Sequence, residues 1–195
     1  MLYADRDVLL VDKDERIVAL WDFAIRATRA DIMRIPCVQA VADLPASTPE
    51  GARLLVGWWL DNGTGHPVTK MCKRGRLGTA WDGTLWGKKC REHVAFTVAR
   101  VKHWRVQLGS YEDLPLDQPD TTWFVDPPYQ RAGKTYRHGP KDIDYQHLAE
   151  WCRALPGQAI VCEAADATWL PFEPFGTVRA CHRVAVSHEG LWTNS

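Results

Sequence analysis

A short polar turn directly after an apolar segment is the part of the sequence best suited to chemistry. Residues 122–125, Thr-Trp-Phe-Val, have the composition of a strand, and Asp126-Pro127-Pro128-Tyr129 follows at once. The two prolines stiffen the turn because each fixes φ, and the Pro127 carbonyl offers a hydrogen-bond acceptor. Asp126 supplies a second acceptor and Tyr129 an aromatic face. This combination fits a flat molecule with an exocyclic amino group; the alternative is a proline-stiffened turn without chemistry.

Basic residues are concentrated in one part of the chain. Residues 64–106 carry ten basic residues against Asp82 and Glu92, a net charge of about +8, and the rest of the chain is about −8. This segregation favours a surface that faces a polyanion, whereas a basic face that only aids solubility is the alternative. The candidate nucleic-acid contacts are Lys70, Lys73, Arg74, Arg76, Lys88, Lys89 and Arg91, together with Lys134 and Arg137 in the polar segment 130–138.

Composition excludes several other classes of protein. The chain of 195 residues is 46% hydrophobic and 25% charged, which is ordinary for a globular protein and excludes collagen, coiled coils and intrinsic disorder. No stretch reaches the roughly 18 to 20 apolar residues of a membrane span, and the first residues lack the pattern of a signal peptide. The six cysteines and seven histidines form no CxxC, HxxxH or HExxH pattern, so we assign no metal. We expect an intracellular protein with free thiols.

The pattern of apolar residues predicts the elements that hold the turn. We expect helices at 17–28, 49–61, 92–102 and 144–155, and strands at 7–11, 104–108, 122–125, 158–162, 178–186 and 190–193. Thr48 is expected to cap the second helix, with Pro49 at its first position. Alternating helices and apolar strands predict an α/β layered fold with a largely parallel, buried sheet. Ligands of such sheets bind at the carboxyl ends of strands, where Asp126 is placed.

Several stretches together carry a resemblance to a known family. They are residues 8–14 (Val-Leu-Leu-Val-Asp-Lys-Asp), residues 109–113 (Gly-Ser-Tyr-Glu-Asp), the turn at 126–129, residues 143–145 (Ile-Asp-Tyr), residues 160–163 (Ile-Val-Cys-Glu) and residues 189–194 (Glu-Gly-Leu-Trp-Thr-Asn). In these stretches the chain resembles the Dam-type family of adenine-N6 DNA methyltransferases, and within it the phage and prophage branch. The resemblance covers nearly the whole chain. The Asp-Pro-Pro-Tyr turn is highly specific for amino-methyltransferases, and the other stretches are weak alone.

The resemblance implies a Rossmann-like class I methyltransferase sheet and transfer of a methyl group from S-adenosylmethionine to N6 of adenine in DNA. The catalytic residues would be Asp126, Pro127, Pro128 and Tyr129. Asp126 and the Pro127 carbonyl would accept the two N–H bonds of the amino group, and Tyr129 would stack on the flipped base. Asp12 would hold the ribose of the cofactor, with Tyr111 and Asp113 beside its adenine. The implied location is the cytoplasm of a bacterial phage host.

The sequence differs from the family pattern near the N-terminus. Family members carry a first strand and a glycine-rich cofactor loop before the segment at residue 8, and this sequence begins at Met1-Leu2-Tyr3 without them. We therefore expect an N-terminally truncated sheet with weak or lost binding of S-adenosylmethionine. Either strand 7–11 pairs beside strand 122–125, or a second copy or partner chain covers the exposed sheet edge.

The expected organisation is a single domain over 1–195, with residues 51–106 inserted as a basic target-recognition region. Three function classes follow from it. The first is an adenine-specific DNA methyltransferase. The second is a catalytically impaired nucleic-acid-binding or phage anti-defence or regulatory protein on the same scaffold. The third is an enzyme subunit that another chain completes. Binding of the cofactor separates the first class from the second, and an obligate oligomer identifies the third.

Overall fold

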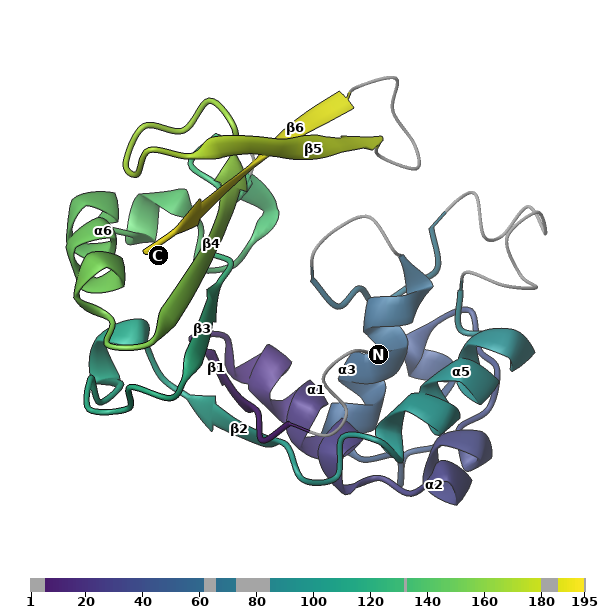
Figure 1. Cartoon of the computed structure of the whole chain (residues 1–195). Helices are drawn as coiled ribbons and strands as arrows, with labels where there is room; N and C mark the ends of the chain where they lie inside the picture. Colours follow the sequence, from purple (N-terminus) through teal and green to yellow (C-terminus); the bar gives the residue numbers. More distant parts are fainter. Residues whose placement is uncertain (1–5, 62–65, 73–84, 132, 180–185, 195) are drawn as a thin grey trace. The chain divides into compact units, whose positions relative to one another are not determined.

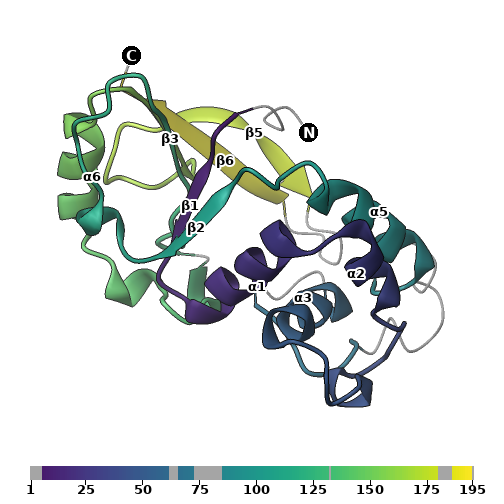
Figure 2. The ribbon, with the colours of Figure 1, turned by 90° about the horizontal axis from the view of Figure 1, so that it is seen from below.

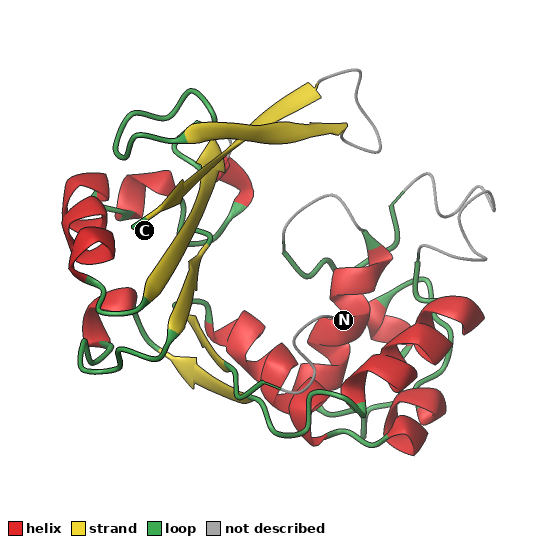
Figure 3. Ribbon diagram, in the orientation of Figure 1, coloured by secondary structure: helices red, strands yellow, loops and turns green. Residues whose placement is uncertain are grey.

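Helices and strands both occur in each half of the computed structural model, which describes residues 6–61, 66–72, 85–131, 133–179 and 186–194 (Figures 1 and 3). The chain divides into two compact units, Met1–Ser110 and Tyr111–Ser195. The predicted α/β class is confirmed, because the described part contains five α-helices and two small sheets. The Rossmann-like sheet and the single domain with an insertion stay predictions. None of the helices in these ranges is long and apolar enough to cross a membrane.

A two-stranded parallel sheet belongs to the first unit. Strand β1 (Leu9–Asp12) pairs with β2 (Arg105–Leu108), so that Asp12 lies opposite Leu108 at the carboxyl ends of both strands (Figure 2). The Gly109 amide donates to the Asp12 carbonyl across 3.1 Å, which continues the ladder by one bond. The expected burial of this strand is wrong, since Leu9 is 41% exposed and the other three residues are half-buried.

Four helices share one apolar core in the first unit. They are α1 (Glu15–Arg26), α2 (Arg29–Arg34), α3 (Glu50–Leu60) and α5 (Lys88–Val98). At Gly51 helix α3 approaches α1 so closely that a Cβ would lie 2.4 Å from the Ala19 carbonyl oxygen. Trp86 is fully buried, and its indole N–H donates to the Pro36 carbonyl across 3.0 Å. Helices α3 and α5 of the expected insertion are therefore part of the same core as α1.

The predicted cap of α3 is wrong by one position. Helix α3 begins at Glu50, its N-cap is Pro49, and no side chain caps it. Thr48 lies before the cap, and its carbonyl accepts a 3.1 Å hydrogen bond from Nε of Arg53. The sequence predicts that the Thr48 hydroxyl caps the helix. Instead, Arg53, one turn into the helix, anchors the preceding loop.

The second unit contains a four-stranded mixed sheet in the order β3-β4-β6-β5. Its strands are β3 (Thr122–Val125), β4 (Gln158–Ala164), β5 (Glu173–Arg179) and β6 (Val186–Thr193). Strands β3 and β4 are parallel, whereas β6 runs antiparallel to both β4 and β5. The expected largely parallel sheet is therefore wrong for this half. The strand expected at 178–186 begins earlier, at Glu173, and residues 180–185 lie outside the described residues.

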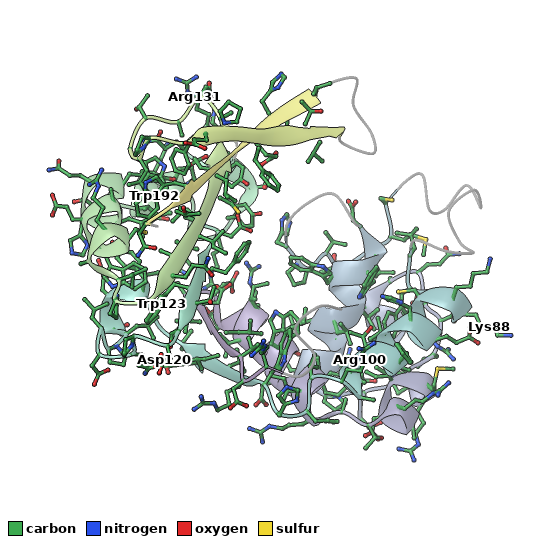
Figure 4. The ribbon with its side chains drawn as sticks, viewed as in Figure 1. Lys88, Arg100, Asp120, Trp123, Arg131 and Trp192 are labelled. Carbon is green, nitrogen blue, oxygen red and sulfur yellow. The ribbon has the colours of Figure 1, made fainter. Side chains whose placement is uncertain are left out.

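Helix α6 (Tyr145–Ala154) connects the two parallel strands along the chain and supplies much of the second core. Asp144 caps it by accepting from the amides of Gln146 and His147. Trp123 and Trp192, labelled in Figure 4, pack against the same cluster as α6. The loop after α6 is tight, because a Cβ at Gly157 would lie 2.0 Å from the Thr121 carbonyl oxygen.

Strand β3 is an edge strand and is less covered than its composition predicts. Phe124 is 66% exposed, although a strand of a parallel sheet is usually buried on both faces. Among the described residues β1 is hydrogen-bonded only to β2, and β3 only to β4. The two strands belong to different units, so the pairing of 7–11 with 122–125 and its alternative, a covering chain, both stay predictions.

Candidate active site

The turn after β3 is held by hydrogen bonds to its second proline and its tyrosine. The hydroxyl of Tyr145, at the start of α6, donates to the Pro128 carbonyl across 2.5 Å. Burial, with the nearby Glu163 carboxylate, raises the pKa of Tyr145 to about 12, so this hydroxyl keeps its proton at neutral pH. The Gly133 amide donates to the Tyr129 carbonyl across 2.9 Å. A Cβ at Gly133 would lie 2.8 Å from Cβ of Pro128, so the segment beyond the turn folds closely back onto it.

A fully buried carboxylate lies behind the turn. Glu163, on β4, accepts from the Gln130 amide and from the Trp169 indole N–H, both at 3.1 Å, through Oε2. Its other oxygen accepts from the Ala164 amide at 2.9 Å. Buried polar groups are costly unless they are hydrogen-bonded, and both oxygens here have partners. Glu163 therefore joins the residue that follows Tyr129 to the centre of the sheet.

The Tyr129 side chain is fixed from the antiparallel strand β6. Its hydroxyl donates to Oε2 of Glu189 across 2.8 Å, and Ser187 donates to the other oxygen of Glu189 across 2.7 Å. Burial, followed by the hydrogen bond to Glu189, raises the pKa of Tyr129. The phenol is consequently a neutral donor with a fixed direction, and its half-buried ring is held in one orientation.

Asp126 and the Pro127 carbonyl remain available as acceptors. No described residue donates a hydrogen bond to either group, although the next three residues of the turn are all anchored. Desolvation by the surrounding protein, then the Glu189 and Glu163 carboxylates, raises the pKa of Asp126. The residue as a whole is nevertheless exposed, so a ligand can reach it. The arrangement presents two unpaired acceptors on a rigid turn beside an oriented aromatic ring.

The residues expected to hold a cofactor lie in both units. Asp12 is half-buried at the end of β1, and its Oδ1 accepts from the Asp14 amide across 2.8 Å. Tyr111 and Asp113 belong to a 3-10 turn at the start of the second unit. The Tyr111 hydroxyl is hydrogen-bonded to Nδ1 of His147 at 2.8 Å, and its ring meets Trp151 edge-on at 5.1 Å. Burial raises the pKa of Tyr111 to about 12.

The expected nucleic-acid contacts are only partly described. Lys88 and Lys89 are exposed in the first turn of α5, and Lys88 extends away from the helix in Figure 4. Lys70 is also exposed, whereas Arg91 is half-buried and donates to the Met33 carbonyl of α2. Arg91 thus links helix α5 to helix α2 through a hydrogen bond. Exposed Lys134 and Arg137 lie in and just after a 3-10 turn that follows residues 126–129. Lys73, Arg74 and Arg76 lie outside the described residues.

Residues that hold the turn were absent from the predicted site. Glu163, Tyr145, Trp169 and Glu189 all contact it or its anchors, and only the resemblance drew attention to any of them. A charged residue inside an otherwise apolar strand was the available signal for Glu163, because such a group needs buried partners. In the described part of the chain, no group of three or more His, Cys, Asp or Glu side chains is arranged to hold a metal ion.

Comparison with protein-family models finds no match to the chain, and comparison with curated proteins finds no significant one.

Proposed function

We propose that this chain is an S-adenosylmethionine-dependent methyltransferase that acts on the N6 amino group of adenine in DNA. One observation carries the proposal: the turn at 126–129 is anchored at Pro128 and Tyr129, while within the described part of the chain the Asp126 carboxylate and the Pro127 carbonyl receive no hydrogen bond. An aromatic amino group has two N–H bonds to donate, so two neighbouring acceptors match it. The resemblance to the Dam-type family points to the same chemistry.

The two acceptors act on the nucleophile. The lone pair of an exocyclic amine is delocalised into the ring, which makes the nitrogen a poor nucleophile. Asp126 and the Pro127 carbonyl accept hydrogen bonds from its two N–H groups and draw the nitrogen toward tetrahedral geometry, which localises the lone pair. The nitrogen would bond to the methyl carbon as the carbon–sulfur bond breaks, S-adenosylhomocysteine would leave, and one N–H proton would pass to solvent. Holding the nitrogen in line with the methyl donor supplies much of the rate. The oriented ring of Tyr129 stacks on the base and keeps it in this position.

The residues expected at the cofactor fit the nucleoside part of S-adenosylmethionine by type. Asp12 places a carboxylate at the carboxyl end of a parallel strand, where such a group hydrogen-bonds ribose hydroxyls. Tyr111 offers an aromatic ring whose hydroxyl is paired with His147. When bound, the cofactor supplies an electrophilic methyl group on sulfonium. The proposed role of Asp12 is to hold the ribose, and that of Tyr111 and Asp113 is to lie beside the adenine.

Exposed cations would hold the DNA. Lys88 and Lys89 stand at the N-terminus of α5 with no acidic residue in the same turn. Phosphates favour that end of a helix, and lysine side chains bind them as point charges. These residues set affinity rather than sequence preference, because phosphate contacts carry no base information.

The decisive experiment measures transfer of tritiated methyl groups to adenine-rich duplex DNA, with identification of N6-methyladenine in the product. Asp126→Ala should lower transfer at least about 1000-fold while the protein stays folded, because Asp126 works on the substrate. Asp120→Ala is the matched control, since Asp120 is an exposed acid before the same strand (Figure 4). DNA binding without methyl transfer by the wild type would instead support the non-catalytic nucleic-acid binder. Wild-type activity in Asp126→Ala would refute the proposed role of the turn.

A further inference from the structure

Glu163 is the one acidic residue whose side chain is fully buried among the described residues. Its strand neighbours Ala159 and Val161 are buried and apolar. None of the described cations forms an ion pair with it, and its partners are all N–H donors. An apolar residue at this position would leave these N–H donors without an acceptor, and a buried donor without a partner is costly. The carboxylate is therefore tied to this set of donors, and their positions in the chain are the informative feature.

Two branches lead from this carboxylate to the catalytic turn. The first is direct, because Oε2 of Glu163 accepts from the Gln130 amide immediately after Tyr129. The second begins at the same oxygen, which accepts from the Trp169 indole. The Trp169 ring packs on the Tyr145 ring with centroids 5.5 Å apart, and the Tyr145 hydroxyl donates to the Pro128 carbonyl. The turn is thus held on both sides of Tyr129 from one buried group.

We infer that Glu163 is the positioning residue of the catalytic turn: with Trp169 and Tyr145 it fixes the backbone so that the Pro127 carbonyl and Asp126 converge on the substrate amino group. This inference rests on the proposed function. Glu163 itself touches neither Asp126 nor the position of the substrate through a hydrogen bond of the described structure. Its effect passes through Gln130 on one branch and Pro128 on the other.

The substitution Glu163→Gln keeps the shape of the side chain and leaves one acceptor oxygen in place of two, so that an NH2 group faces at least one of the three N–H donors of Gln130, Ala164 and Trp169. At saturating DNA and cofactor we expect kcat to fall about 10- to 100-fold, since a displacement near 1 Å of a catalytic group has effects of this size. KM for DNA should stay within about twofold of wild type, because the phosphate contacts are unchanged. Glu150→Gln is the matched control, since Glu150 is an exposed glutamate on α6, and it should leave both constants unchanged.

A second readout does not depend on activity. Hydrogen exchange of the Gln130 amide, followed by NMR, should be at least about tenfold faster in Glu163→Gln than in wild type, and unchanged in Glu150→Gln. Tyr145→Phe removes only the hydroxyl of the second branch. Its effect on kcat should be less than additive with that of Glu163→Gln, because both act on one turn.

The outcomes separate this inference from the proposed function. If wild type transfers no methyl group, the proposed function fails, and the exchange rate alone decides whether Glu163 anchors the turn. Unchanged exchange at Gln130 overturns the inference. Faster exchange with unchanged kcat in an active enzyme overturns it as well. If Glu163→Gln does not fold, Trp169→Phe, which removes one donor and keeps an aromatic ring on Tyr145, is judged by the same two measurements.

Discussion

The hydroxyl of Tyr129 donates to Oε2 of Glu189 across 2.8 Å and thereby joins the turn after β3 to strand β6, 60 residues later. This bond forms because β6 lies antiparallel beside β4, so that Glu189 pairs in register with Ala164, the residue after Glu163. The ring that would stack on the target base is therefore oriented by a strand that is distant in sequence. Strand β6 also places the Glu189 carboxylate near Asp126, and this charge helps to raise the pKa of Asp126.

The ring and the hydroxyl of Tyr129 should have separable roles. Tyr129→Ala removes the stacking face and should weaken binding of the flipped base by roughly 1 to 3 kcal/mol, about 5- to 150-fold in kcat/KM. Tyr129→Phe keeps the face and loses the bond to Glu189, so it should lower the free energy of unfolding by about 1 kcal/mol and affect transfer far less. Steady-state kinetics and urea unfolding of both variants check this. Equal kinetic losses would argue against stacking by the ring.

Glu189→Gln should move the pH dependence of the reaction. The ionised carboxylate of Asp126 is a stronger hydrogen-bond acceptor than the protonated acid, so activity should fall as pH drops through its pKa. The negative charge of Glu189 helps to raise that pKa, and its removal should lower the pKa. The acid limb of kcat/KM against pH should therefore shift to lower pH. Ser187→Ala is the control, because it removes a hydrogen bond to Glu189 and leaves its charge in place; an equal shift in that variant would contradict the electrostatic explanation.

Asp126→Asn should stabilise the folded protein at neutral pH. The pKa of Asp126 is raised above its ordinary value of 3.8 in the folded state, so the folded state binds this proton more tightly than the unfolded state does. The charged form consequently destabilises the fold above the folded pKa, and this destabilisation disappears as pH falls below 3.8. Calorimetry should show a higher Tm for Asp126→Asn at neutral pH and equal Tm values well below 3.8. A lower Tm at neutral pH would show that the charge is satisfied in the fold.

Local sequence patterns predict the strand before the turn and the elements around it. The strand at 122–125 has its predicted bounds, and β4, α6 and α1 lie within a few residues of expectation, because apolar spacing and caps such as Asp144 are encoded over short distances. The start of α3 differs from the prediction because Arg53 donates a hydrogen bond to the preceding loop and the Thr48 side chain does not cap the helix. This arrangement depends on how the loop packs, and a capping pattern in the sequence does not describe that packing.

The surroundings of the turn needed the tertiary structure. Glu163 lies 33 residues after its partner Gln130, and Glu189 lies 60 residues after its partner Tyr129. The pairing of β4 with β3 and β6 brings both carboxylates to the turn. The apolar content of β6 does not indicate that this strand runs antiparallel to β4 and β5. The unexpected exposure of Phe124 likewise follows from the position of β3 at an edge, which strand composition does not reveal.

Reversal of Lys88 and Lys89 to glutamate tests the proposed DNA-binding surface. Both side chains are exposed at the N-terminus of α5, so the double variant should fold normally. Each phosphate contact contributes about 0.9 to the slope of log K against log salt on duplex DNA, and loss of two contacts should lower the slope by about 1.8.

The matched control reverses Lys141 and Arg153, which are exposed in the second unit and change the net charge by the same amount. Fluorescence anisotropy at several salt concentrations measures both slopes. A slope equally lowered in both variants would mean that net charge alone governs binding, and an unchanged slope in the Lys88/Lys89 variant would leave these lysines a role in solubility only.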